Sequence, residues 1–148
     1  MKKQIKLFAA LALSVLTLAF ASCTKSNEDL IVGKWNANRA VMTVTISGAG
    51  EEYDGTQTEE HAFEAGEAGF TFQEDGTLII WSRDGEDQTA NYTVKDNTLT
   101  ITIPGDEGNE TYTIELLNKK QLTLKSHLEM SNEGVTMSMD TEIHCDRA

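Results

Sequence analysis

The sequence predicts an all-β fold, an antiparallel up-and-down meander of about eight strands that closes into a β-barrel. Short segments rich in Val, Ile, Thr and aromatic residues follow one another from Lys34 onward, and turn residues separate them at short intervals. No long amphipathic helical pattern interrupts this series, which disfavours a βαβ arrangement. Closure of the meander would remove its exposed strand edges; an open β-sandwich is the alternative.

The length of 148 residues is sufficient for one domain preceded by an export segment. The first 22 residues contain three lysines, the apolar stretch Leu7 to Phe20 and the small pair Ala21-Ser22. This pattern is typical of a secretory signal peptide, and the apolar stretch is shorter than the roughly 20 residues that cross a bilayer. We therefore expect a signal peptide over 1–22, a modified cysteine and tether over 23–29, and a barrel domain over 30–148.

The segment Phe20-Ala21-Ser22-Cys23 resembles the lipobox of bacterial lipoproteins. The resemblance implies that Cys23 receives a diacylglycerol, becomes the mature N-terminus and is held in the membrane by acyl chains such as palmitate. It also implies an outer-membrane location, facing either the periplasm or the cell surface. If Cys23 is instead unmodified, an oxidising compartment could join it to Cys145.

The expected strands of the body follow in order, each ended by a turn. They are Ala40–Ile46, a short strand near Thr58–Phe63, Gly69–Phe72, Thr77–Arg83, Gln88–Val94, Thr98–Ile103, Thr111–Leu117, Gln121–Met130 and Val135–Cys145. The steps Asp75-Gly76 and Asp84-Gly85 are strong hairpin signals. The acidic segment from Glu51 to Gly69 is the least regular part of the chain and is not placed by its pattern.

Gly33-Lys34-Trp35 opens the body, where Gly allows close backbone approach and an indole can plug one end of a barrel. Together with Phe70–Leu78, Tyr92-Thr93-Val94 and Gln121–Leu124, this motif resembles the lipocalin-like domain of Gram-negative bacterial lipoproteins. The resemblance covers most of residues 30 to 145. It implies that Gly33 and Trp35 help to close the barrel and that a basic side chain stacks on Trp35, with Arg147 and Arg39 as the two candidates.

Alternation predicts which side chains line the inside of such a barrel. The odd positions of the last strand share one face, and an eight-stranded barrel is either filled by its side chains or holds one small ligand. The candidate ligand-binding residues are Phe70, Phe72, Trp81, Tyr92, Met137 and Met139. Core packing is the competing role for the same residues.

No residue pattern indicates catalysis or a cofactor. His144 and Cys145 point to opposite faces of a strand and cannot form a nucleophile–base pair, so Cys145 is expected to be a buried free thiol. His61, His127 and His144 lack metal-ligand spacing, and no metal site is expected. The acidic turns at 84–87 and 106–110 do not follow a calcium-loop pattern.

Charge narrows the range of partners. Removal of Lys2, Lys3 and Lys6 with the signal peptide leaves 9 basic against 24 acidic side chains, a net charge of about −15. Such a surface repels nucleic acid. The leading functional hypothesis is a non-catalytic, lipid-anchored envelope protein that binds a small hydrophobic ligand. The alternative is a filled barrel that docks an unidentified protein or glycan partner through its acidic loops.

Overall fold

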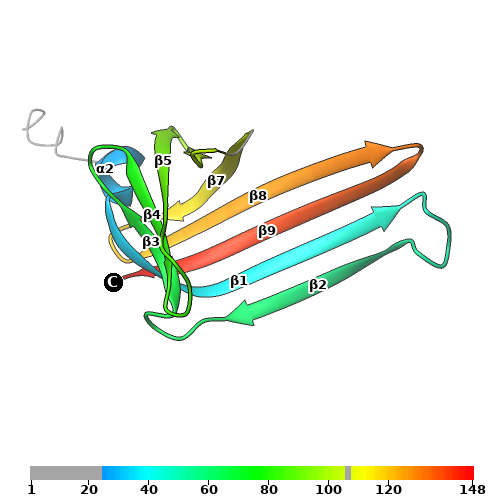
Figure 1. Cartoon of the computed structure of the whole chain (residues 1–148), viewed down its shortest axis with the longest axis horizontal. Helices are drawn as coiled ribbons and strands as arrows, with labels where there is room; N and C mark the ends of the chain where they lie inside the picture. The colour runs from blue at the N-terminus through cyan, green and yellow to red at the C-terminus, as the bar shows by residue number, and fades with distance from the viewer. Residues whose placement is uncertain (1–24, 106–107) are drawn as a thin grey trace, which may run out of the picture.

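The computed structural model describes residues 25–105 and 108–148, which form one short helix and nine strands (Figure 1). The elements are α2 (Asn27–Ile31), β1 (Gly33–Ser47), β2 (Gly55–Ala62), β3 (Ala68–Phe72), β4 (Thr77–Ser82), β5 (Gln88–Lys95), β6 (Thr98–Thr102), β7 (Asn109–Leu117), β8 (Gln121–Asn132) and β9 (Val135–Arg147). All strand pairs are antiparallel, in the order β2-β1-β3-β4-β5-β6-β7-β8-β9, and β1 also pairs with β9. Eight strands therefore close into a barrel, which confirms the predicted fold.

Strand β1 changes its hydrogen-bonding partner along its length. Its first residues, Gly33 to Asn36, pair with β3, while Arg39 to Ile46 pair with β2. The register with β9 shifts between Ala37 and Arg39, so a bulge marks the point where β1 leaves β3. As a result β2 lies outside the closed barrel and pairs only with β1.

Beyond this bulge a four-stranded sheet projects from the barrel, and we call it the arm. The arm consists of 39–47 of β1, all of β2, 125–132 of β8 and 135–144 of β9. Figure 1 shows these four long strands side by side, extending away from the barrel and from α2. The acidic segment that the sequence pattern did not place thus forms the loop and edge strand on one side of the arm.

The barrel core is built from the alternating positions of its strands. The buried apolar side chains are Ile31, Trp35, Ala37, Phe72, Leu78, Ala90, Val94, Leu99, Ile101, Ile114, Leu122, Leu124 and Cys145. Leu122 and Leu124 are 0% and 1% exposed, whereas Leu128 and Met130 of the same strand face are 48% and 49% exposed. The inner face of the barrel therefore continues onto the arm, where it loses its cover.

Helix α2 covers one end of the barrel. Ser26 caps it by accepting a hydrogen bond from the Asp29 backbone NH, and Asn27 Nδ2 donates to Asp96 O and to Asn97 Oδ1, both at 2.9 Å. The last three residues of the expected tether, 27–29, form the start of this helix. The predicted signal peptide and Cys23 lie outside the described residues. Among the described residues, no helix combines the length and apolarity that a membrane crossing requires.

Candidate functional site

The covered end of the barrel is closed by Trp35 and Arg147, which are register partners on β1 and β9. Arg147 Cζ lies 4.1 Å from the centroid of the Trp35 ring, and Arg147 Nη1 donates to Val32 O at 2.8 Å. A second Arg147 nitrogen donates to Leu30 O, and Trp35 Nε1 donates to Ile31 O at 2.7 Å. Arg147 thus occupies the stacking position, and Arg39 instead pairs with Glu60 on the arm.

Gly33 is required beside this pair. Its φ of 130° lies in a region that L side chains rarely adopt, and a Cβ there would lie 2.4 Å from Arg147 Nη1. The short helix, the indole and the guanidinium together seal this end of the barrel against solvent.

Two of the candidate ligand residues, Phe72 and Tyr92, also lie toward this closed end. Phe72 is 1% exposed and packs edge-to-face on Tyr92, with ring centroids 4.9 Å apart. Tyr92 OH donates to Gln73 O at 2.7 Å. Phe72 is thus part of the packed core of the barrel, and Tyr92 packs against that core.

The opposite end of the barrel is open and apolar. A pocket of about 250 Å³, which we call the mouth pocket, lies where β1, β3, β4 and β9 diverge. Its apolar lining includes Ala37, Ala40, Phe63, Phe70, Ile80 and Ile143. Phe70, another candidate ligand residue, therefore lines a solvent-accessible apolar pocket.

A second hollow, of about 370 Å³, lies across β9 from the mouth pocket. Tyr112 of β7, Leu128 of β8 and Met139 of β9 contribute to its lining. Tyr112 OH donates to Glu110 Oε2 at 2.9 Å, which gives this hollow one polar wall. Met139 and Met137, the remaining pair of candidate residues on β9, therefore lie on the inner face of the arm, at and beyond the rim of the barrel.

Trp81 lies on the outer surface of the barrel. Leu78 and Ile80 of β4 face the core, so Trp81, at odd spacing from both, points the other way. Its ring packs over Gly69, and Lys34 Nζ lies 4.4 Å from the ring centroid. Trp81 nevertheless borders the mouth pocket at its rim, together with Gly69 and Ser82.

The comparisons with known proteins agree with this architecture. The model of the lipocalin-like domain family matches residues 31–124, which run from the end of α2 to the fourth residue of β8. The chain belongs to the lipocalin-like domain family. No curated protein and no solved structure was found to match it. The family is typically a binding fold rather than an enzymatic one.

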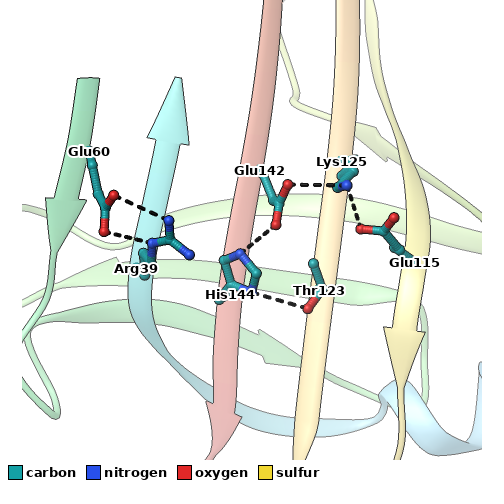
Figure 2. A network of polar contacts seen from close by, with 7 residues as sticks. All are labelled: Arg39, Glu60, Glu115, Thr123, Lys125, Glu142 and His144. Carbon is teal, nitrogen blue, oxygen red and sulfur yellow. Dashed lines mark hydrogen bonds and ion pairs between the residues drawn. The ribbon is translucent and has the colours of Figure 1, made fainter. Parts of the chain in front are cut away.

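The outer face of the lipocalin-like barrel carries a polar network where it meets the arm (Figure 2). Lys125 Nζ lies 2.7 Å from Glu115 Oε2 and 3.1 Å from Glu142 Oε2. Glu142 Oε1 in turn lies 2.6 Å from His144 Nε2, and His144 Nδ1 is 3.3 Å from Thr123 Oγ1. Figure 2 shows Arg39 and Glu60 as a separate pair beside this chain of contacts.

The network changes the acidity of its carboxylates. Partial burial of Glu142 opposes ionisation, but the hydrogen bond and charge of Lys125, together with His144, hold its pKa below the ordinary value. The hydrogen bond from Arg39, followed by its charge, lowers the pKa of Glu60. Both carboxylates are therefore ionised at neutral pH, and the network stabilises the base of the arm.

Cys145 and the histidines do not form a reactive centre in the lipocalin-like barrel. Cys145 is a free thiol, 2% exposed, and burial followed by the nearby Asp146 charge raises its pKa to about 12. His144 lies on the opposite face of β9, toward Thr123 and Glu142. In the part of the chain that the structure describes, no group of three or more His, Cys, Asp or Glu side chains could hold a metal ion.

Several residues of the mouth pocket were not among the sequence-based candidates. Ile80 could have been chosen over Trp81 by its even spacing from Leu78, which is buried. Phe63 follows the polar strand β2, and its backbone NH donates to Asn38 O at 2.9 Å, which brings it back to the bulge in β1. Its signal in the sequence is an isolated aromatic residue at the end of a polar run. Ala37, Ala40 and Ile143 offer no such signal, because their position depends on how β1 and β9 leave the barrel.

Proposed function

We propose that this lipocalin-like protein binds a small hydrophobic molecule at the mouth of its barrel and does so without catalysis. The observation that supports this best is the contrast between the two ends. One end is sealed by α2, Trp35 and Arg147, while the other opens through the mouth pocket onto an apolar, methionine-bearing sheet face. Ligand pockets are typically concave, mostly apolar and equipped with a few polar groups, which here include Ser82 and Gln88.

The ligand in this proposal lies at the rim rather than deep inside the barrel. Bulky side chains fill the covered half, including Trp35, Phe72 and Leu78, each at most 1% exposed. Space is available instead at Phe63, Phe70 and Ile80, and beyond β9 near Met139. Methionine adapts its shape readily and suits a site that accepts apolar molecules of varied form.

Binding of the fluorescent probe N-phenyl-1-naphthylamine tests this proposal. Phe63→Ser removes an apolar wall of the mouth pocket, and we expect it to weaken probe binding about tenfold, equivalent to about 1.4 kcal/mol. Tyr53→Ser is the matched control, because Tyr53 is 68% exposed in the loop between β1 and β2. Equal affinity of the two variants, with unchanged melting temperatures, would contradict the mouth site. Native mass spectrometry of the protein from its own envelope then gives the mass of the natural ligand.

We also propose that the protein is anchored to the outer membrane through a lipid on Cys23, facing the periplasm or the cell surface. The signal-like segment and the lipobox-like motif support this proposal. The wild-type chain should incorporate radioactive palmitate and Cys23→Ser should not; absence of label on the wild type would refute anchoring. Protease treatment of intact cells distinguishes surface display, in which the body is cleaved, from periplasmic display.

A second candidate function is docking of an envelope protein or glycan through the acidic segment from Glu51 to Gly69. It is favoured by β2, which bears Glu59 and Glu60, pairs only with β1 and is exposed along its whole length. Because β2 is part of the arm, substitution of exposed carboxylates on β2 and in the loop that follows it tests this function better than deletion. A Glu59→Gln, Glu64→Gln variant that keeps full partner capture would refute it.

A further inference from the structure

The inner face of the arm is an apolar surface that extends beyond the mouth pocket. It is formed by Met42, Val44 and Ile46 of β1, Leu128 and Met130 of β8, and Met137 and Met139 of β9. These side chains are direct cross-strand neighbours: Met139 pairs with both Val44 and Leu128, and Met137 with both Ile46 and Met130. Met42, Leu128 and Met130 are 38%, 48% and 49% exposed. Figure 1 shows no helix or strand of the described residues lying across the arm.

The outer face of the same arm has the chemistry of a surface that remains in water. Thr43 and Thr58 hydroxyls lie 3.1 Å apart, and those of Thr45 and Thr56 lie 3.0 Å apart. His127 Nδ1 lies 2.7 Å from Asp140 Oδ1 on this face. The arm is therefore amphipathic in the manner of a sheet that covers a core on one side, yet no element among residues 25–105 and 108–148 supplies a second layer.

The distribution of charge favours a second copy of this chain as the layer that covers the inner face of the arm. The chain carries 24 acidic against 12 basic side chains, but the inner-face positions of β1, β8 and β9 within the arm carry no charged group. Glu59 and His61 on β2 lie only at its margin. Two inner faces can therefore meet without the repulsion that would accompany contact between other surfaces of two acidic chains.

The area of the face is sufficient for a dimer. Four strands spaced about 4.8 Å apart, each contributing about nine residues at about 3.3 Å, give a flat area of about 570 Å². Two such faces would bury about 1,100 Å², which exceeds the roughly 1,000 Å² expected of a specific interface. Sheets pack face to face with their strands aligned within about 30°, and identical faces are suited to a two-fold axis.

We propose that two copies of this chain dimerise by packing the apolar inner faces of their arms against each other, forming an eight-stranded sandwich between two barrels. The interface is the arm beyond the mouth pocket, centred on Val44 and Met139. The interface shares Leu128 and Met139 with the second hollow, but none of its residues lines the mouth pocket, so its failure would leave ligand binding in the mouth pocket standing.

Cross-linking of the full chain in intact envelopes tests the dimer without detergent, which could itself cover the apolar face. Val44→Cys places a thiol at the centre of the inner face, and Thr45→Cys places one on the outer face of the same strand. With a short bismaleimide, Val44→Cys should give a covalent homodimer in severalfold higher yield than Thr45→Cys. Equal yields from the two variants, or a Val44→Cys adduct with a different protein, would overturn the proposal.

A charge substitution provides the second test. The solubilised full chain should show twice its monomer mass by light scattering, with the detergent contribution subtracted. Val44→Glu should reduce it to the monomer, while the matched Thr45→Glu should remain dimeric, both with unchanged circular dichroism. Absence of a covalent homodimer of Val44→Cys in intact envelopes, or a Val44→Glu protein that keeps the dimer mass, would exclude this interface.

Discussion

The guanidinium of Arg147 lies over the indole of Trp35, with Cζ 4.1 Å from the ring centroid, although 112 positions separate the two residues along the chain. Arg147 also donates hydrogen bonds to the carbonyls of Leu30 in α2 and of Val32, which joins α2 to β1. One side chain thus joins the first strand, the last strand and the covering helix. The stability of the closed end depends on this junction.

Arg147→Ala should therefore destabilise the protein by about 2 to 4 kcal/mol, since it removes a cation–π contact and charge-assisted hydrogen bonds to backbone carbonyls. Arg147→Lys should recover only part of this loss, because an ammonium lacks the planar fork. Urea unfolding monitored by tryptophan fluorescence measures both. Arg83→Ala, which removes an exposed 3.4 Å ion pair with Glu64, is the control and should change stability by less than about 1 kcal/mol.

Gly33→Ala should destabilise the protein by more than about 1 kcal/mol, because the new Cβ is strained by a φ of 130° and clashes with Arg147. Two further glycines separate these causes. Gly50 has a φ of 108° with open space around its Cβ position, and Gly55 has neither strain nor clash. The denaturant midpoint should be highest for Gly55→Ala, lower for Gly50→Ala and lowest for Gly33→Ala. Equal midpoints for Gly33→Ala and Gly50→Ala would show that the clash with Arg147 is unimportant.

Cys145 should react with maleimide far more slowly in the native protein at pH 8 than in guanidinium chloride, because its thiol is buried and its pKa is raised to about 12. Peptide mapping by mass spectrometry assigns the label to this residue. Rapid labelling of the native chain would show that the barrel opens at β9.

The raised pKa of Cys145 also predicts alkaline sensitivity. A thiol whose folded pKa exceeds its unfolded value of about 9 favours the folded state below pH 9, and this contribution declines as the pH rises toward 12. Burial and the adjacent Glu110 likewise raise the pKa of Tyr112. The melting temperature of Cys145→Ala should therefore fall less steeply between pH 9 and pH 11 than that of the wild type.

Acid should weaken the base of the arm through Glu142, whose pKa is lowered in the folded state. Its contribution to stability is present above the ordinary value of 4.5 and is lost as the pH falls through the folded pKa. Glu142→Gln should thus reduce stability at pH 7 and lose less stability than the wild type between pH 5 and pH 3. Glu129→Gln, at an exposed position on β8, is the comparison; an identical acid response of all three proteins would argue against this role of the network.

Local pattern was sufficient for most of the secondary structure. The expected strands Gln88–Val94 and Val135–Cys145 differ from β5 and β9 by only one or two residues at one end, because alternation and turn residues act over a few positions. The polar strand β2 was placed only roughly, near 58–63 instead of Gly55–Ala62, since it lacks a buried face. The acidic residues around β2 show no alternation of apolar and polar side chains, so the sequence does not indicate which strand pairs with it.

The sequence by itself determined the all-β class, the approximate strand number and the closing role of Gly33 and Trp35, since each depends on alternation, turn chemistry or a local motif. Only the tertiary structure decided that β1 leaves β3 at a bulge to pair with β2, and that Ile80 rather than Trp81 faces inward at the mouth. It also separated Phe72 and Tyr92 toward the closed end from Met137 and Met139 on the arm. The physical reason is that strand partners and barrel ends are set by pairings between distant segments, which a period of two residues along one strand does not encode.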